Sequence, residues 1–352
     1  MAPTEQLSSF ISRRRFLRQS FAFSALAALG SDLGFAHSAA APGAHEILMI
    51  GDWGYENAEA QAHVAAGMTA YARKNSIRPD AFFLLGDNWY GALEGGANST
   101  RWKTNFEDLY PREVYDCPAY AVLGNHDYQR WPESKVDAEL AYARIPGSRW
   151  IMPARWYTFE FPRKNPLITF IALDSNMPHP PKAGEKANSD KPKSDKPSRD
   201  FTLTPEEKDQ QLDWLIAELE RPRTTPYLAV IAHHPVYSNG PHGDHPTLIA
   251  DWDPLFRKHN VTLYLAGHDH DLQHLEFENH PTSFFLSGGG GADLYDIKVD
   301  PAHRGPYGQK VYGFSQLSVT PEQLTLRHFD SDGRLIHAFR KTPSGKITLA
   351  SS

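Results

Sequence analysis

Six short apolar runs recur along the chain, and each is followed directly by a polar cluster. The runs cover residues 47–50, 81–85, 120–123, 168–173, 228–232 and 263–266. They are continuously apolar rather than alternating, which predicts strands buried on both faces of a sheet. A glycine or alanine stands between most runs and their polar cluster, and a glycine there lets the backbone turn sharply.

Two stretches between these runs have helical periodicity. Residues 57–74 carry apolar groups at helical spacing, and the sequence from Thr204 to Glu207 has the cap, proline and acidic residue of a helix start. An apolar stripe follows over residues 212–219. Strands alternating with helices predict a largely parallel sheet, with its polar clusters gathered beyond the carboxyl ends of the strands.

The C-terminal part has a different pattern. Residues 284–286, 313–319, 323–329 and 335–341 predict strands, and residues 330–333 have the composition of a hairpin turn. We expect these strands to form a second sheet packed against the first within one domain, residues 41–352. The glycines at 288–291 lack the lysine and the helix of a phosphate-binding loop, which favours close backbone packing near a site.

Composition narrows the class of protein. The chain has 352 residues, of which 40% are hydrophobic, enough for a sizeable core. Its net charge of −6 leaves no basic excess, which argues against binding to a nucleic-acid backbone. Cys117 is the single cysteine, so neither an internal disulfide nor a zinc–thiolate cage can form.

The first 40 residues resemble a twin-arginine export signal. Arg13 and Arg14 precede Phe16-Leu17-Arg18, an apolar run over 21–29 and then small residues. That run is shorter than the roughly 20 residues that span a bilayer, so no stable membrane anchor is expected. A basic tail or an anchor is the alternative. The signal predicts passage of the folded chain through the twin-arginine machinery to the periplasm or the extracellular space.

Residues 178–200 are rich in proline, lysine, serine and aspartate, with Asp190-Lys191-Pro192 nearly repeated at 195–197. Because this composition cannot bury apolar surface, it predicts a mobile surface loop. Polar clusters lie on both sides of the loop, so it is not a linker between domains.

The polar clusters that follow the apolar runs supply side chains that bind metals. The oxygen donors are Asp52, Asp87 and Asn125, and the imidazoles are His233, His268 and His270. Hard oxygens combined with imidazoles suit iron, zinc or manganese. A single ion would not use all six, whereas two ions bridged by one carboxylate would. Such a pair predicts attack of a metal-activated hydroxide on a phosphate ester, with a nearby histidine protonating the leaving group.

Five of the clusters form motifs in a fixed order. They are Gly51-Asp52-Trp53-Gly54, Gly86-Asp87-Asn88-Trp89-Tyr90, Gly124-Asn125-His126-Asp127, Ala232-His233-His234-Pro235 and Gly267-His268-Asp269-His270. Together they resemble the calcineurin-like metallophosphoesterases. Tyr90, three residues after Asp87, is similar to the purple acid phosphatases, and most of all to their small tartrate-resistant type. The resemblance covers residues 45 to about 340.

The resemblance implies an α/β fold: a four-layer α/β/β/α sandwich of two mixed sheets flanked by helices, with the metal site at the carboxyl ends of strands. It also implies a role for each matching position. Asp52, Tyr90 and His270 would hold the first metal, with Asp87 bridging, and Asn125, His233 and His268 would hold the second.

Histidines outside this ligand set are the candidates for contact with substrate. His126 resembles the substrate-contacting histidine of the family, and His242 is the candidate acid for the leaving group. Proline and glycine around His242 could shift the match, which leaves His245 as the alternative. His234 is expected in the second shell or facing substrate. Asp127 and Asp269 are expected to orient neighbouring ligands through hydrogen bonds.

Tyr90 bears on the identity of the metals. A phenol has a pKa of about 10 and binds as phenolate only to a strongly acidic cation. Tyr90 therefore favours ferric iron (Fe3+) in the first site, with Fe2+, Zn2+ or Mn2+ in the second. The alternative is that the tyrosine ring covers a pair of zinc or manganese ions without binding them.

These observations predict an exported acid phosphatase, a phosphoric monoester hydrolase that acts on small-molecule phosphate esters and is expected to be a monomer. A phosphodiesterase or nucleotidase on the same scaffold is the near alternative. A non-catalytic metal-binding protein is the alternative from another class, and the intact ligand set together with His126 argues against it.

Overall fold

A computed structural model describes residues 43–55, 58–129, 134–178 and 202–350 of the protein. The predicted signal over 1–40 lies outside the described residues. So does the predicted surface loop over 178–200, apart from Pro178. Among the described residues, no helix combines the length and the apolar character that crossing a membrane requires.

The described residues form two β-sheets. The first contains β1 (His45–Ile50), β2 (Ala81–Leu84), β3 (Ala119–Ala121), β4 (Trp150–Ile151), β12 (Gly313–Val319), β13 (Leu324–Asp330), β14 (Leu335–Lys341) and β15 (Ile347–Leu349). The second contains β5 (Tyr157–Phe161), β6 (Ile168–Ala172), β7 (Tyr227–Ile231), β8 (Leu263–Ala266), β9 (Leu272–Leu275), β10 (Ser283–Ser287) and β11 (Pro306–Gln309). Their orders are β15-β14-β13-β12-β1-β2-β3-β4 and β11-β9-β10-β8-β7-β6-β5.

The predicted apolar runs form the parallel centre of each sheet. In the first sheet β1, β2, β3 and β4 are parallel neighbours, and in the second β6, β7, β8 and β10 are. Every residue of β2, β6, β7 and β8 is buried, as continuous apolar runs predict. The carboxyl ends of these strands therefore lie together, which is where the polar clusters begin.

The expectation that the C-terminal strands make the second sheet by themselves was wrong. Strand β12 pairs antiparallel with β1, placing Ile47 opposite Leu317, and so extends the first sheet. Strand β10 joins β8 in the second sheet instead. The reason is that β1 is buried and would otherwise expose an unpaired edge, and β12, buried along its whole length, completes that edge.

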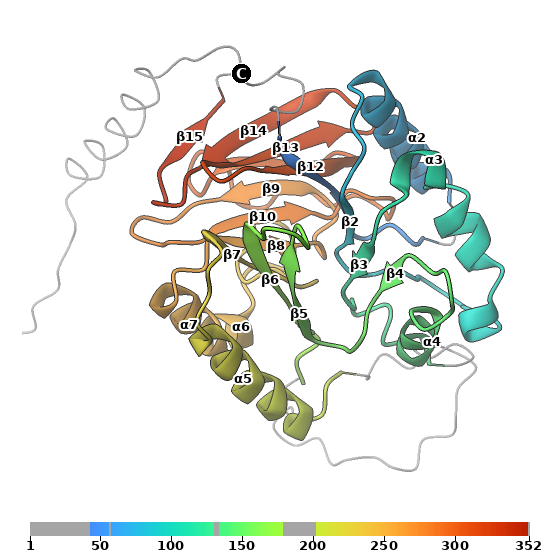
Figure 1. Cartoon of the computed structure of the whole chain (residues 1–352), viewed down its shortest axis with the longest axis horizontal. Coiled ribbons are helices and arrows are strands. Elements are labelled where there is room, and N and C mark those ends of the chain that lie inside the picture. The colour runs from blue at the N-terminus through green and yellow to red at the C-terminus, as the bar shows by residue number, and fades with distance from the viewer. Residues whose placement is uncertain (1–42, 56–57, 130–133, 179–201, 351–352) are drawn as a thin grey trace, which may run out of the picture.

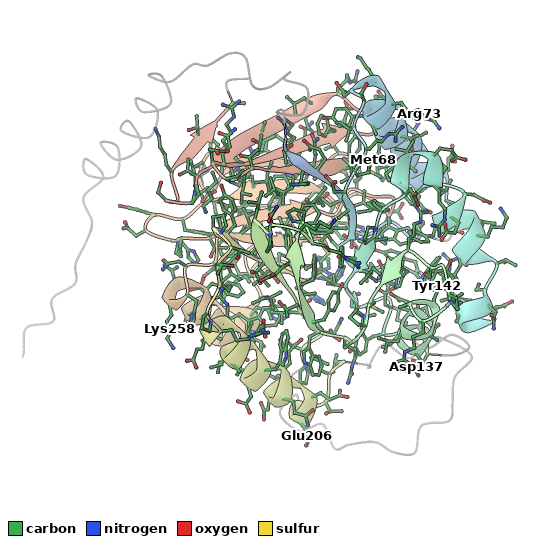
Figure 2. The ribbon with its side chains drawn as sticks, viewed as in Figure 1. Met68, Arg73, Asp137, Tyr142, Glu206 and Lys258 are labelled. Atoms are coloured by element: carbon green, nitrogen blue, oxygen red, sulfur yellow. The ribbon has the colours of Figure 1, made fainter. Side chains whose placement is uncertain are left out.

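Helices cover the outer face of each sheet, which confirms the predicted four-layer sandwich (Figure 1). One outer layer contains α2 (Glu59–Lys74), α3 (Arg112–Tyr115) and α4 (Lys135–Tyr142), and the other contains α5 (Pro205–Glu220), α6 (Pro246–Asp251) and α7 (Asp253–Lys258). On α2 the side chain of Met68 is buried against the first sheet, whereas Arg73 is exposed (Figure 2). Helix α5 begins with the predicted capping box, in which Thr204 and Glu207 each bond the other's backbone.

The two sheets meet closely at their carboxyl ends. The N–H of Gly51, just after β1, donates to the carbonyl of Ser287 at the end of β10, at 2.7 Å. Gly290 lies against the same turn, and a Cβ added to it would fall 2.3 Å from the oxygen of Gly51. The close packing predicted for residues 288–291 is thereby confirmed, and it brings the loops of both sheets to one place.

Candidate metal centre

Three of the predicted ligands have a left-handed backbone. The φ angles of Asp52, Asp87 and His268 are 57°, 50° and 72°, and each residue follows the end of a buried strand. Non-glycine residues rarely adopt this conformation, and it costs about 1–3 kcal/mol where it occurs. This left-handed conformation at the ends of β1, β2 and β8 directs the three side chains toward a common point.

The predicted first group of ligands lies together around the phenol of Tyr90. Its oxygen is 2.9 Å from Oδ2 of Asp87, 3.3 Å from Oδ1 of Asp52 and 3.1 Å from Nε2 of His270. Ligand atoms of Asp52, Asp87 and His270 all lie within 4.8 Å of one another, and all three residues are buried.

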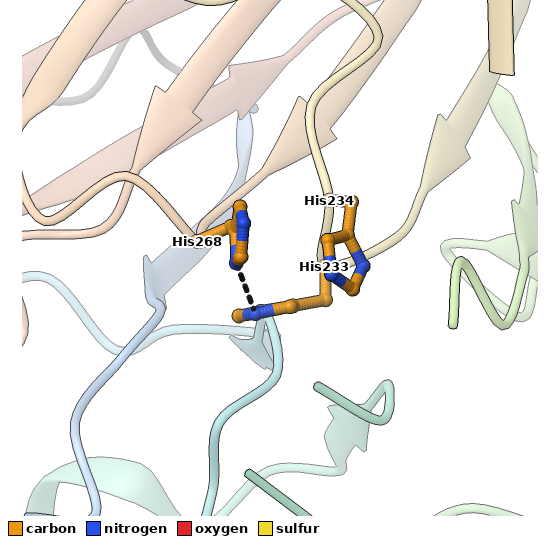
Figure 3. Close-up of side chains that lie close together, drawn as sticks. All are labelled: His233, His234 and His268. Atoms are coloured by element: carbon orange, nitrogen blue, oxygen red, sulfur yellow. Dashed lines mark hydrogen bonds between the residues drawn. The ribbon is translucent and has the colours of Figure 1, made fainter. Parts of the chain in front are cut away.

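The predicted second group lies beside the first. Nε2 of His233 is 3.1 Å from Oδ1 of Asn125 and 3.2 Å from Nδ1 of His268, and Figure 3 shows these two imidazoles approaching each other. The same nitrogen lies 3.5 Å from Oδ1 of Asp87. Asp87 therefore contacts both groups, which is the position that a bridging carboxylate needs.

Backbone carbonyls fix the orientation of two imidazoles. Nδ1 of His233 donates to the carbonyl of Leu85 at 3.0 Å, and Nδ1 of His270 donates to the carbonyl of Asp293 at 2.6 Å. Each Nε2 then carries a lone pair that points into the cluster. The lone pair of His233 faces Asn125 Oδ1 and Asp87 Oδ1, which can only accept. Acceptors gathered in this way fit a cation between them.

Burial and mutual repulsion act on the carboxylates. Desolvation, reinforced by the charge of Asp87, raises the pKa of Asp52 well above its ordinary value. Burial would also raise the pKa of Asp87, but the neighbouring His233 and His126 outweigh it, so the pKa of Asp87 is lowered. Two buried carboxylates this close are stable as anions only beside positive charge.

The pKa shifts of the phenol and of the imidazoles have opposite consequences for metal binding. Desolvation and the two carboxylates raise the pKa of Tyr90 well above its ordinary value, so only a strongly acidic cation would displace its proton. Desolvation lowers the pKa of His233 and His270 and lowers that of His268 furthest. Neutral imidazoles with available lone pairs are the form that binds a metal. The residues present therefore fit a pair of cations.

The two histidines predicted to contact substrate lie against different parts of the cluster. The ring of His126 lies 4.1 Å from that of Tyr90, and the backbone N–H of His126 donates to Oδ1 of Asp87 at 2.7 Å. The ring of His242 lies 4.2 Å from that of His268, and its side chain is 44% exposed. His245, the alternative acid, instead caps α6, where its Nδ1 accepts from the N–H of Leu248.

Asp127 accepts hydrogen bonds from three backbone N–H groups and, at 3.2 Å, from Nδ2 of Asn88. Its carboxylate accepts from the N–H groups of Gly124, Asn88 and Trp89 at 2.8, 3.1 and 2.8 Å. These bonds join the loop that carries Asp87 to the loop that carries Asn125. Asp127 thus acts on the ligands through their loops.

His234 lies closer to the predicted ligands than the sequence indicated. One of its ring nitrogens falls within 4.8 Å of those of His233 and His268. Its Nδ1 and its backbone N–H both contact Oγ of Ser175, at 2.9 and 2.8 Å. Ser175 is fully buried, so it fixes the ring in one orientation.

Sequence reasoning missed the partners that come from non-repeating loops. Tyr295 stacks on His270 with ring centres 4.1 Å apart, and Asp293 contributes only its carbonyl. A backbone carbonyl leaves no signal in residue identity, and Tyr295 follows no apolar run. The one available hint was the adjacent glycine run at 288–291, which places this loop near the site.

Fold and site together define a phosphoesterase. The chain belongs to the calcineurin-like phosphoesterase family, whose model matches residues 45–272. It is 30% identical over 305 residues to tartrate-resistant acid phosphatase type 5 of Mus musculus, covering 82% of this chain and 87% of the mouse protein. The expected family is confirmed, and the predicted phosphoric monoester hydrolase agrees with the name of this relative.

Solved structures show the same fold. A purple acid phosphatase from yellow lupin, Lupinus luteus, aligns with a TM-score of 0.61 at 17% identity, over 85% of this chain and 54% of that one. GAP50, described as the anchor in the inner membrane complex of Plasmodium, aligns with a TM-score of 0.64 at 20% identity, over 84% and 87%. The fold thus occurs both in a named phosphatase and in a protein named for anchoring.

Proposed function

We propose that the protein is an exported acid phosphatase that hydrolyses phosphate monoesters with two metal ions. The observation that carries this proposal is the convergence of four oxygen ligands and three imidazoles from five loops on one point. The ligand set is Asp52, Asp87, Tyr90, Asn125, His233, His268 and His270. Small-molecule phosphate esters are the proposed substrates, in keeping with the family and its acid phosphatase members.

Each group of side chains would hold one ion. Asp52, Tyr90 and His270 would hold the first, which we propose to be Fe3+, because a phenol binds as phenolate only to a strongly acidic cation. The second, held by Asn125, His233 and His268 with Asp87 between them, would be Fe2+, Zn2+ or Mn2+. When bound, such a pair supplies a hydroxide nucleophile and polarises a phosphoryl oxygen.

Two histidines would act on the substrate itself. His126, whose ring lies beside Tyr90, would donate a hydrogen bond to the phosphate group. His242, whose Nδ1 is bonded to Asp269, would protonate the leaving alkoxide. A positioned acid of this kind contributes about 10²–10⁴-fold to turnover.

Two other functions remain as alternatives. A phosphodiesterase or nucleotidase would use the same ligands with a differently shaped substrate site. A non-catalytic role is favoured by one observation, the similarity in fold to the anchor protein GAP50. The buried, strained ligand loops and the held imidazole of His242 favour catalysis over that role.

Export is proposed from the sequence of residues 1–40, with release as a folded monomer into the periplasm or extracellular space. The twin-arginine pair Arg13 and Arg14 supports this route. Replacing both by lysine should leave the protein inside the cell, as fractionation of cells expressing the full chain would reveal. Unchanged export of the variant would contradict the route.

Metal content and a visible spectrum of the purified protein test the metal assignment. We expect two ions per chain, one of them iron, and a visible band from phenolate bound to Fe3+. Turnover of p-nitrophenyl phosphate against bis(p-nitrophenyl) phosphate tests the substrate class. A colourless protein holding only zinc or manganese would overturn the ferric assignment, and a preference for the diester would favour the alternative.

A further inference from the structure

The carbonyl groups of four consecutive residues, 89–92, are all bonded by two cationic side chains. Lys135 Nζ donates to the oxygens of Trp89 (2.6 Å) and Gly91 (3.1 Å), and Arg101 Nη1 donates to those of Tyr90 and Ala92 (2.7 Å each). Alternate carbonyls go to alternate cations. Lys135 and Arg101 therefore both hold the backbone of the segment that carries Tyr90.

Arg101 also joins this segment to the loop of another ligand. Its Nη2 donates at 2.9 Å to the carbonyl of Gly54, two residues after Asp52, and the same oxygen accepts from the N–H of Tyr90 at 2.9 Å. One guanidinium thus bonds two of the three loops that would supply the first metal, those of Asp52 and Tyr90. The planar fork of arginine suits this task because its donors diverge in fixed directions.

Lys135 lies at a helix position that is unfavourable for a cation. It is the first residue of α4, where the helix dipole disfavours positive charge, and only 1% of its surface is exposed. The side chain of Glu139 on the same helix bonds Nδ2 of Asn88, directly before Trp89. Burying the charged ammonium group of a lysine is unfavourable unless the charge is paired. Here the carbonyls of residues 89 and 91 and the nearby carboxylates of Asp127 and Glu139 offset that desolvation.

We infer that Arg101 and Lys135 are positioning residues that fix the Tyr90 phenol in place for the first metal. The inference rests on the proposed two-metal function. The phenol oxygen lies within 2.9–3.3 Å of three other ligand atoms, so a small shift of its backbone would take it out of that arrangement. Both cations bond the carbonyls of residues 89–92, so both would act through that backbone.

Titration of metal-free protein with Fe3+ and then with Zn2+, each followed by competition with a chromophoric chelator, tests this role. We expect the unmodified protein to bind one ion of each kind, and Tyr90→Phe to weaken the Fe3+ step, which identifies that step with the first site. Lys135→Met and Arg101→Met should each weaken that step by about 10–100-fold and leave the other step unchanged. Rescue is expected from Arg101→Lys in part, because one of its three bonds can be remade.

Arg149→Met is the matched control. Arg149 is also buried and donates to backbone carbonyls, those of Tyr115 at 2.9 Å and Tyr110 at 2.5 Å, but these belong to no ligand loop. Its substitution should lower thermal stability without changing either the Fe3+ or the Zn2+ step. A first-site loss in Arg149→Met equal to that in Lys135→Met would reduce the effect to general destabilisation and overturn the inference.

A double substitution separates action through Tyr90 from any other action. If Lys135 works through the phenol, Lys135→Met should cost no further affinity in a Tyr90→Phe background. Fully additive losses would contradict the inference. If Lys135→Met does not fold, Lys135→Gln, which can still donate to a carbonyl, carries the same comparison. Failure of the unmodified protein to bind two ions would instead overturn the proposed function.

Discussion

His242 and Asp269 form a hydrogen-bonded pair, with Nδ1 of the imidazole 2.7 Å from Oδ1 of a fully buried carboxylate. The same carboxylate accepts from the hydroxyl of Ser238 and, at 3.4 Å, from the N–H of His242. The bond places the Nδ1 proton on the side of Asp269, so Nε2 is the ring atom left for a leaving group. Asp269 was expected to orient a metal ligand, but its bond is to the candidate acid.

Replacing His242 by alanine should slow the hydrolysis of alkyl phosphates far more than the hydrolysis of p-nitrophenyl phosphate. An alkoxide needs a proton as it leaves, whereas p-nitrophenolate hardly does, so we expect a loss of about 10²–10⁴-fold in kcat for the former. Steady-state kinetics with both esters measures the difference. His245→Ala is the control, since that ring caps α6. Equal losses for both esters would remove His242 from protonation of the leaving group.

Asp269→Asn should act in the same direction as His242→Ala, but more weakly. The amide can still contact the ring, yet it no longer favours the tautomer that keeps Nε2 free. The discriminating measurement is the alkyl-to-aryl ratio of kcat in the double variant. If Asp269→Asn lowered the alkyl-to-aryl ratio much further in a chain that already carries His242→Ala, the two residues would act independently.

Tyr90→Phe should abolish the visible band while leaving the second metal bound. The phenylalanine ring fills the same space beside His126 but has no oxygen to bind the first ion. Absorption spectra and metal analysis of the purified variant provide the readout. Persistence of the band would assign the colour to another ligand.

His126→Ala should cost about 10²-fold or more in kcat/KM without loss of metal. The ring lies against Tyr90 and contributes no atom to either proposed ligand group, so the expected defect lies in binding of the phosphate group. The inhibition constant of inorganic phosphate should rise in parallel. Unchanged turnover would exclude this histidine from the mechanism.

Acid should destabilise the fold through the buried His328, which is not one of the proposed metal ligands. Burial lowers the pKa of His328 to about 3, against an ordinary value of 6.5. Below pH 6.5 the unfolded chain takes up a proton that the native chain refuses until about pH 3. The stability that His328 contributes is therefore present above pH 6.5 and lost as pH falls through that window, by about 3 kcal/mol at pH 4.5.

The measurement is thermal unfolding at pH 7.5 and 4.5 under fixed, saturating metal. His328→Gln can keep contacts to Ser315 and to the carbonyl of Gln273, and it should unfold with a smaller loss on acidification. Substitution of the exposed His63 is the control. An acid-induced loss as large in His328→Gln as in the unmodified protein would show that the destabilisation arises elsewhere.

The buried centre of the fold could be predicted because its strands are continuously apolar. The runs at 81–85 and 228–232 predicted β2 and β7 to within a residue at each end. The sheet membership of β12 could not be predicted, because a buried strand fits either sheet by composition. Strand β9, Leu272–Leu275, was missed since its Gln273 and His274 interrupt the apolar pattern although both are buried.

The loops that carry the proposed ligands could be predicted from the sequence, whereas the residues that support those loops could not. Asp87 and His268 stand in motifs whose residue types reveal their chemistry. Arg101 and Lys135 stand in helical segments of ordinary composition, and their role depends on which carbonyls they reach. Contacts to backbone atoms depend on the tertiary structure, so they cannot be predicted from a pattern of residue types.

The proposed ligands divide by chemistry between the two sheets. Loops after β1, β2 and β3 of the first sheet supply every oxygen, and loops after β7 and β8 of the second supply every imidazole. A chain in which only one sheet has formed would offer a harder or a softer half-site, and neither half has the full donor set. Binding of both ions would therefore require that the two sheets have packed together. The metal content of a preparation would then indicate how much of it has folded completely. The proposed twin-arginine route, which carries folded chains, would then carry chains that already hold both ions.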